Sequence, residues 1–123
     1  MKTMLERTTS EDYIKELISL IKNETAQLLV LKCIFTYPEY IQRIKTARLN
    51  AVNEARINKY SNSYTSAFIL YRIDSAVQEV HRDMQSAFEI LTARLKFSQP
   101  ELLNNAHYNK LKEHVKYPPE YVI

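Results

Sequence analysis

Residues 67–97 read AFILYRIDSAVQEVHRDMQSAFEILTARLKF and carry the longest hydrophobic seam in the chain. The apolar positions of this seam recur with alternating steps of three and four, which is typical of a helix packed lengthwise against other helices. These positions are Leu70, Ile73, Val77, Val80, Met84, Ala87 and Leu91. Further apolar side chains widen the seam, and they are Phe68, Ala76, Phe88 and Leu95. A seam of this width favours a helical-bundle core over a two-stranded coiled coil.

The composition also favours an all-α protein, because the 123 residues include no glycine. Glycine supplies positive φ angles and close backbone approach, which tight β-hairpins and phosphate-binding loops require. The absence of glycine excludes the P-loop, the dinucleotide-binding fingerprint and the G-x-S-x-G nucleophile elbow. Hydrophobic residues make up 46% of the chain and charged residues 25%, as in ordinary folded domains.

A single cysteine, Cys33, rules out a disulfide within the chain, so we expect a reducing, intracellular compartment. No signal peptide is apparent. The apolar run around Cys33 is much shorter than the roughly 20 residues that cross a bilayer. We therefore expect a protein with no membrane span.

Three more helical segments are predicted besides residues 67–97. The first begins at a Thr9 or Ser10 cap after a loose leader of residues 1–9, and it ends near Phe35. Its segment Asn23-Glu24-Thr25 is polar enough to bend the helix or to form a solvated turn of it. Its half from Leu28 to Phe35 is apolar enough to be buried nearly all round. The second segment runs from about Tyr37 to Tyr60, and the last from about Gln99 to Lys116.

Two corners share one pattern of capping residues, Phe35-Thr36-Tyr37-Pro38-Glu39-Tyr40 and Phe97-Ser98-Gln99-Pro100-Glu101-Leu102. In the first corner, the pattern predicts Thr36 as the helix N-cap, with Pro38 in the first turn and Glu39 completing a capping box. The second corner has the same arrangement. Both corners are therefore predicted helix starts.

Residues 58–63 are rich in cap and turn formers, so they predict a break between the second helix and the long third one. A continuous helix through this break is the alternative, because neither proline nor glycine enforces the break. Four helical segments with short connections predict an antiparallel four-helix bundle over residues 1–116. Residues 117–123 are predicted to form a short extended C-terminal tail.

The residue types that carry catalysis or bind metals are sparse and scattered. His107 and His114 lie seven residues apart on one helix face, which is too few ligands for a metal site. Neither these two nor His81 has a glutamate three residues before it, so a di-iron bundle is excluded. Cys33 lies in an apolar run, where a thiol is inert. We therefore predict no enzyme, no cofactor and no bound metal; an enzyme site shared between subunits would have to form around the histidines.

The net charge of +3 is concentrated in residues 36–60. Four cations there, Lys45, Arg48, Arg56 and Lys59, fall within about 80° of one another on a helical projection, and we call them the basic stripe. Such a row suits the phosphates of a nucleic acid, with nearby tyrosines available for stacking. These tyrosines are Tyr37, Tyr40 and Tyr60. The alternative is that the long basic side chains only cover the neighbouring apolar face with their stems.

The tail carries a second candidate site, made of Tyr117, Pro118, Pro119, Tyr121 and Ile123. The sequence Pro118-Pro119-Glu120-Tyr121 resembles the PPxY motif, the peptide class that WW domains bind. Adjacent prolines favour a polyproline II strand, and the tyrosine fills a second pocket. The last three residues also resemble a hydrophobic C-terminal PDZ ligand. The alternative is a tail that folds back onto the bundle or pairs with a second copy.

Together these features predict a non-catalytic helical protein–protein interaction module, an adaptor or a subunit of a larger assembly. Self-association is included in this prediction, because the seam of residues 67–97 is wide. Neither a small-molecule substrate nor a membrane span is expected. The alternative function is nucleic-acid binding through the basic stripe.

Overall fold

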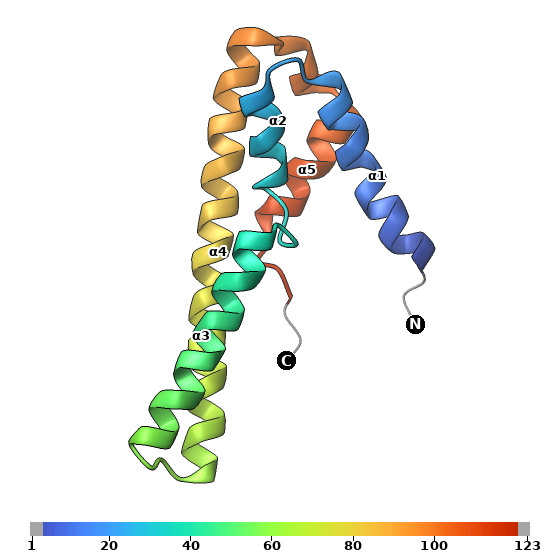
Figure 1. Ribbon diagram of the computed structural model, residues 1–123. Helices are drawn as coiled ribbons and strands as arrows, with labels where there is room; N and C mark the ends of the chain where they lie inside the picture. Colours follow the sequence, from blue (N-terminus) through green and yellow to red (C-terminus); the bar gives the residue numbers. More distant parts are fainter. Residues whose placement is uncertain (1–3, 121–123) are drawn as a thin grey trace. The chain divides into compact units, whose positions relative to one another are not determined.

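The computed structural model describes residues 4–120, with side chains from Asp12 onward. Every ordered element in this part of the chain is helical, and no strand is present in it (Figure 1). The elements are α1 (Met4–Leu20), α2 (Glu24–Leu31), α3 (Pro38–Ile57), α4 (Asn62–Ser98), the 3₁₀ helix η1 (Pro100–Asn104) and α5 (Ala106–Lys116). The all-α prediction is therefore confirmed, while the four-helix-bundle arrangement stays a prediction.

The chain divides into two compact units, and α4 contributes to both. Unit 1 consists of the described parts of Met1–Ile34 and Asp83–Tyr117. Unit 2 consists of the described parts of Phe35–Arg82 and Pro118–Ile123.

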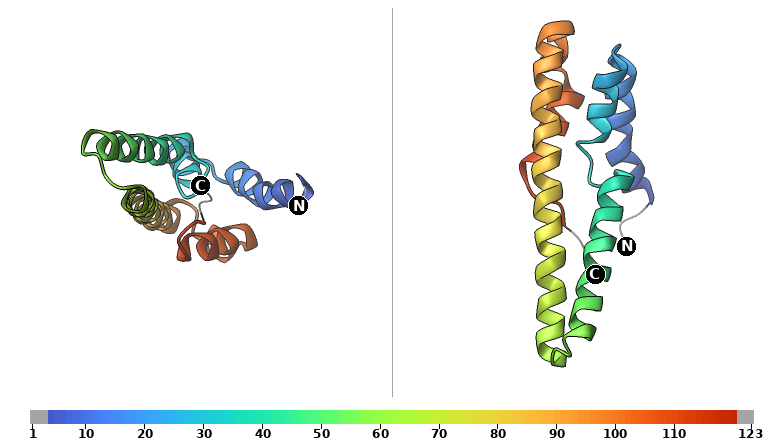
Figure 2. Two further views of the ribbon diagram at one scale, coloured as in Figure 1. Left: turned by 90° about the horizontal axis from the view of Figure 1, so that it is seen from below. Right: turned by 60° about the vertical axis from the view of Figure 1, so that its left-hand side comes forward.

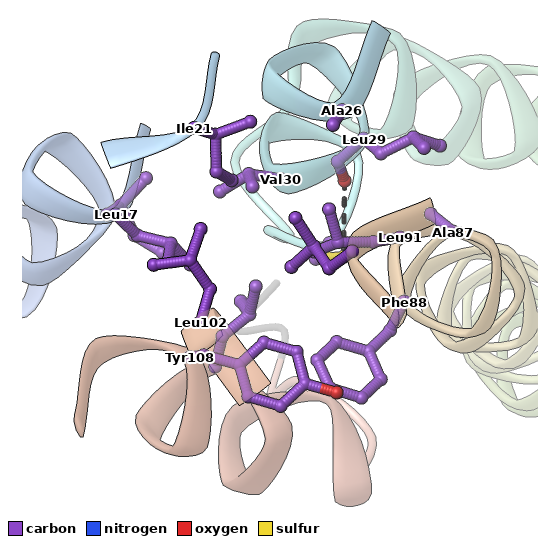
Figure 3. Close-up of a cluster of buried hydrophobic side chains, with 14 of the residues drawn as sticks. Leu17, Ile21, Ala26, Leu29, Val30, Ala87, Phe88, Leu91, Leu102 and Tyr108 are labelled. Atoms are coloured by element: carbon purple, nitrogen blue, oxygen red, sulfur yellow. Dashed lines mark hydrogen bonds between the residues drawn. The ribbon is translucent and has the colours of Figure 1, made fainter. Parts of the chain in front are cut away.

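Unit 1 contains a large buried hydrophobic cluster, to which α1, α2, η1, α5 and the C-terminal part of α4 contribute (Figure 3). Its fully buried members include Leu17 of α1, Val30 of α2 and Leu91 of α4. The rings of Phe88 and Tyr108 stack at 5.3 Å between centroids. Figure 3 shows these side chains converging from several helices on one interior, so burial of apolar surface holds unit 1 together.

The first predicted helix is two helices in the structure, because α1 ends at Leu20 and α2 begins at Glu24. Asn23 is the N-cap of α2, and its side-chain oxygen accepts a 3.0 Å hydrogen bond from the backbone N–H of Ala26. The polar segment Asn23-Glu24-Thr25 therefore restarts the helix instead of bending it.

The buried Gln99 side chain connects this corner to the end of α4. Its Nε2 donates to the carbonyl oxygen of Leu20 at 2.9 Å, and its Oε1 accepts from the backbone N–H of Lys22, also at 2.9 Å. One amide side chain thus satisfies two backbone groups that the end of α1 leaves without helical partners.

Three expectations for the N-terminal region are wrong. The helix begins at Met4, so most of the predicted leader of residues 1–9 is helical, and both Thr9 and Ser10 lie inside α1 instead of capping it. On α2, Leu28 and Leu31 are exposed, because only one side of this helix faces the cluster. Periodicity could not show this, since apolar residues occupy the whole circumference of α2.

The two predicted corners begin helical segments, but not through the predicted caps. Pro38 lies in the first turn of α3 as predicted, whereas the N-cap is Tyr37 without a side-chain cap bond, so the Thr36 prediction is wrong. At the second corner, Ser98 is still the last residue of α4, and its hydroxyl donates to the Arg94 carbonyl oxygen at 2.8 Å. In both corners the proline follows a residue that adopts the cap position without a side-chain bond.

The predicted helix from Gln99 to Lys116 is likewise two segments. The 3₁₀ helix η1 ends at Asn104, and α5 begins at Ala106. Asn105 separates them in an extended conformation, and its side chain accepts a 2.8 Å hydrogen bond from the backbone N–H of His107. Asparagine is favoured at the N-cap because its side chain accepts a hydrogen bond from a backbone N–H. At Asn105 this cap starts a new helix, so the predicted single helix is interrupted.

Unit 2 is an antiparallel hairpin of α3 and the first part of α4, which lie side by side in Figure 2. Arg72 of α4 donates to both carboxylate oxygens of Glu54 at 3.1 and 3.2 Å, and Arg43 lies 3.9 Å from Glu79. The buried side chains of the hairpin are Tyr40, Ile44, Ala51, Ala55, Ile73, Val77, Val80 and His81. Small alanines at the buried positions of α3 allow its backbone to approach its neighbour closely.

The turn of the hairpin confirms the predicted break, so the alternative of one continuous helix is wrong. The backbone N–H of Tyr60 bonds to the carbonyl of Ala55 at 3.1 Å, and that of Lys59 to the carbonyl of Arg56 at 3.3 Å. This is a Schellman motif, which places the residue after the helix cap in the left-handed region. Lys59 occupies that position with φ 54°, where most proteins have glycine.

The seam predicted for residues 67–97 lies on α4, which is longer than predicted by several residues at its start. Its members from Ile73 to Leu91 are buried, as predicted. Leu70 is the exception, with 54% of its surface exposed. The apolar periodicity of α4 therefore continues beyond the part of the helix that other elements cover.

Candidate interaction surfaces

The basic stripe lies on the outer side of α3 and at its C-terminal turn. Lys45, Arg48 and Arg56 are exposed residues of the helix, and Lys59 is exposed in the turn that follows it. With a rise of about 1.5 Å per residue, the row from Lys45 to Arg56 extends about 16 Å along the helix. The structure therefore exposes all four cations; Lys45, Arg48 and Arg56 share one face of α3, whereas Lys59 lies beyond the end of the helix with a left-handed backbone.

The carboxylates of α3 leave this positive surface uncompensated. Glu54 is bound to Arg72 of α4 on another flank of the helix, and Glu39 lies in the first turn of α3. Among the side chains of residues 12–120, none of the four stripe cations has a carboxylate partner within ion-pair distance. The positive charge on this side of α3 therefore faces solvent.

Two apolar side chains lie within the stripe. Val52 is half-buried, and Leu49, which the sequence analysis missed, is 60% exposed. At about 100° per residue, both fall within 40° of the direction of Lys45. The spacing 45, 49, 52, 56 is the signal that identifies them, because steps of four and three keep residues on one helix face.

The aromatic residues expected near the stripe are occupied in the fold. Tyr40 is buried, with its ring 5.2 Å from that of Tyr37 in an edge-to-face arrangement. Tyr60 packs against Tyr64 at 4.7 Å and against Phe68 at 5.4 Å at the turn of the hairpin. The prediction that Tyr40 stacks on nucleic-acid bases is therefore wrong, and Tyr60 already makes aromatic contacts within the protein.

A second surface lies on α4 of the hairpin and consists of Tyr64, Ala67, Leu70 and Tyr71, which we call the α4 patch. Tyr64 is 54% exposed, Leu70 54% and Tyr71 68%, and Ala67 is exposed as well. The four residues span two helical turns on the side of α4 that projects away from the Arg72–Glu54 ion pair. Four exposed side chains that are mainly apolar therefore lie close together along this stretch of α4.

The tail predicted as a peptide ligand is described only in part. Tyr117 ends α5 in an extended conformation (φ −113°, ψ 146°) and is 64% exposed. Pro118 is exposed and Pro119 is half-buried. Tyr121 and Ile123 lie outside the described residues, so the tail stays a prediction.

His107 and Cys33 make contacts within unit 1. His107 Nε2 lies 2.8 Å from a carboxylate oxygen of Glu16, which joins α5 to α1. Partial desolvation lowers the pKa of His114 below its ordinary value. Burial raises the pKa of the Cys33 thiol to about 12, and the thiol donates to the carbonyl oxygen of Leu29 at 3.2 Å. A thiol with so high a pKa is unreactive near neutral pH.

A shallow pocket of about 310 Å³ lies between α4 and α5 in unit 1. Phe88 and Val115 form its apolar floor, and its rim carries both signs of charge, with Glu89 and Glu113 near Lys112 and Lys116. No histidine, cysteine or aspartate lines it.

Within the side chains that the structure describes, no three histidine, cysteine, aspartate or glutamate residues are grouped so that they could hold a metal ion. Of the helices in the described part of the chain, none is both long enough and apolar enough to cross a membrane.

Comparison of the chain with models of protein families, with curated proteins and with solved structures gives no match. The function is therefore inferred from the surfaces of the two units alone.

Proposed function

We propose that this chain is a non-catalytic helical protein–protein interaction module, an adaptor or a subunit of a larger assembly, and that its hairpin is the docking element. The candidate partners include other copies of the same chain, so self-association is part of the proposal. The observation that carries the proposal is the α4 patch, because Leu70 continues the buried seam of α4 and is nevertheless 54% exposed.

The distribution of apolar residues supports this role. The large hydrophobic cluster draws all its members from unit 1, so the outer side chains of the hairpin are not needed to complete that core. Contiguous exposed apolar side chains on a folded protein typically mark sites of protein contact. Tyrosine and leucine on one helix face suit a partner helix or groove, since aromatic side chains dominate interface energetics.

We further propose that the helices of residues 1–116 form an antiparallel four-helix bundle and that the protein works in a reducing intracellular compartment. Contacts of α1 with both α2 and α5 support the first proposal. The buried, protonated thiol of Cys33 supports the second, because it is the only cysteine and is held as a thiol.

The experiment is affinity capture from lysate of the source organism, with light scattering of the purified chain to detect self-association. We expect the double variant Leu70→Ser/Tyr71→Ser to lose the partner or the oligomer that the unchanged chain retains. Phe97→Ser is the matched control, because Phe97 is 95% exposed and lies on the part of α4 that belongs to unit 1. The proposal is contradicted if the chain is monomeric and captures no stoichiometric partner. It is also contradicted if the double variant retains the partner as well as the unchanged chain does.

The second candidate function is nucleic-acid binding, and the exposed, uncompensated cations of the basic stripe favour it. If the stripe tracks phosphates, binding of an oligonucleotide falls steeply with salt, and reversing the charges of Lys45, Arg48 and Arg56 abolishes it. Binding that changes little between 50 and 300 mM salt would count against this candidate.

A further inference from the structure

We propose that the outer face of α3 docks an acidic amphipathic helix of a partner protein. The face consists of Leu49, Val52, Lys45, Arg48 and Arg56, and we call it the α3 docking face. Its two apolar residues lie between the cations along the helix axis, and Leu49 forms one edge of the face. This inference rests on the proposed function, because it names the chemistry of a partner for an interaction module. It concerns a different surface from the α4 patch.

The first argument is the arrangement of apolar and charged side chains. Leu49 is 60% exposed, and it lies with Val52 between cations that precede and follow it along the helix. Protein interfaces have this composition, with an apolar centre that loses its water and a polar rim that stays partly hydrated. The stems of the cations add apolar surface beside Leu49 and Val52, while their charged ends remain in water.

The second argument is charge. All the ionic side chains of the docking face are cations, and the nearest carboxylate along α3, that of Glu54, is already bound by Arg72. The other carboxylate of α3 belongs to Glu39, which lies about 120° from Lys45 on a helical projection. A partner that brings glutamate or aspartate to the rim gains attraction with no competing carboxylate, whereas a basic partner is repelled.

The third argument is length. The docking face extends from Lys45 to Arg56, about 16 Å or three helical turns at about 1.5 Å per residue. A partner helix of about 12 residues matches this length, with leucines spaced by three and four on one side and acidic residues beside them.

The same face is less suited to a nucleic acid. Leu49 and Val52 lie between the cations along the helix axis. A phosphate backbone that passed over them would lose hydrating water to apolar side chains, which is unfavourable. The aromatic side chains that could stack on bases are engaged elsewhere, since Tyr40 is buried and Tyr60 packs against Tyr64 and Phe68. The observations therefore favour a helix that supplies both apolar and acidic side chains.

The test uses the full chain and three fluorescent probes. The first probe is a 14-residue designed helix with leucines at positions 4, 7, 8 and 11 and glutamates at the flanking positions. The second is the same helix with its leucines replaced by alanine, and the third is a 16-nucleotide single-stranded DNA. Fluorescence anisotropy measures the affinity of each probe at 50 and 300 mM salt.

We expect saturable binding of the leucine-containing helix and at least about tenfold weaker binding of its alanine counterpart. Leu49→Ala should weaken the first probe by about tenfold, while the matched variant Ile57→Ala, at a 78% exposed position outside the face, leaves it unchanged. Neutralising the rim with Lys45→Gln/Arg48→Gln/Arg56→Gln should weaken it by about tenfold or more, and Lys96→Gln should not.

Three results would overturn the inference. The first is no saturable binding of the leucine-containing helix. The second is affinity that is unchanged by Leu49→Ala. The third is tighter binding of the DNA that weakens about 40-fold between 50 and 300 mM salt, as three phosphate contacts predict for a single strand. That result would assign the face to nucleic acid. Failure of all peptide binding leaves the proposed function intact if Leu70→Ser/Tyr71→Ser still releases the captured partner, so the two failures are distinguishable.

Discussion

Lys59 shows at the level of a single residue how this chain turns a corner without glycine. The turn after α3 requires a left-handed residue, and lysine adopts this conformation at φ 54°. For a residue with a Cβ, the left-handed region costs about 1–2 kcal/mol relative to the right-handed one. The hydrogen bonds from Tyr60 and Lys59 to the last turn of α3 compensate for this strain.

We therefore predict that Lys59→Gly raises the free energy of unfolding by about 0.5–1 kcal/mol. Relief of the strain outweighs the larger conformational entropy that glycine gives to the unfolded chain. Urea denaturation measures the change. The control, Lys45→Gly in the exposed interior of α3, should lower the stability by about 1 kcal/mol. Equal losses in both variants would mean that the Lys59 backbone is not strained.

Gln99 is the second residue on which local structure depends. Replacing it with leucine keeps a similar volume but removes the donor to Leu20 and the acceptor from Lys22. We expect Gln99→Leu to lower the free energy of unfolding by about 1–3 kcal/mol, because two part-buried hydrogen bonds worth about 0.5–1.5 kcal/mol each are lost.

A control for Gln99→Leu is Gln78→Leu, at an exposed position of α4. Surface substitutions of this kind change stability by less than about 0.5 kcal/mol. If the two variants lose the same stability in urea denaturation, the Gln99 hydrogen bonds contribute nothing beyond helix propensity.

At the level of elements, α2 depends on its cap more than the longer helices do. It has only eight residues, and isolated helices of this length are not stable in water. We predict that Asn23→Ala lowers the free energy of unfolding by about 1 kcal/mol, since the bond from Ala26 to the Asn23 side chain is lost. Thermal unfolding followed by circular dichroism measures this loss. Asn53→Ala, in the exposed interior of α3, should be neutral or slightly stabilising, and a loss there of the same size would argue against the cap.

Prediction from sequence succeeded where one periodic pattern covers a long element. Helix α4 follows from its seam, and α3 follows from Pro38 at its start and the turn formers after Ile57. It failed where a single side chain decides between continuing and restarting a helix. Asn23 and Asn105 each cap a new helix, and no periodic signal distinguishes a capping asparagine from a solvated one inside a helix.

The candidate surfaces were predictable to a similar extent. The basic stripe follows from charge and spacing, and its cations are exposed as predicted. The exposure of Leu49 and Leu70 could not be predicted, because an apolar residue at helical spacing is usually buried and only the tertiary arrangement leaves it uncovered. Tyr40 was offered for base stacking, whereas the structure buries it.

For the whole molecule, the unequal distribution of buried apolar surface predicts unequal local stability. Unit 1 contains the large hydrophobic cluster, whereas the α3 side of the hairpin buries two alanines among its few core residues. Native-state hydrogen exchange should show that amides of α3 open at a lower free energy than those of residues 87–95. Equal protection of both regions would show that the hairpin has the same local stability as the hydrophobic cluster, which contradicts the prediction.

The difference in buried apolar surface also supports the different roles proposed for the two units. Unit 1 supplies stability, and the hairpin exposes the α4 patch and the α3 docking face to partners. Surfaces near the low-stability end of a fold are suited to binding, because a partner that orders them gains contacts without disrupting the main core.

The most direct test compares hydrogen exchange of the free chain with that of the chain in the assembly isolated from its source. The account predicts slower exchange in the hairpin, within residues 45–56 or 62–74, and unchanged exchange in residues 87–95 of unit 1. Slower exchange confined to unit 1, with the hairpin amides unaltered, would contradict the claim that the hairpin is the docking element.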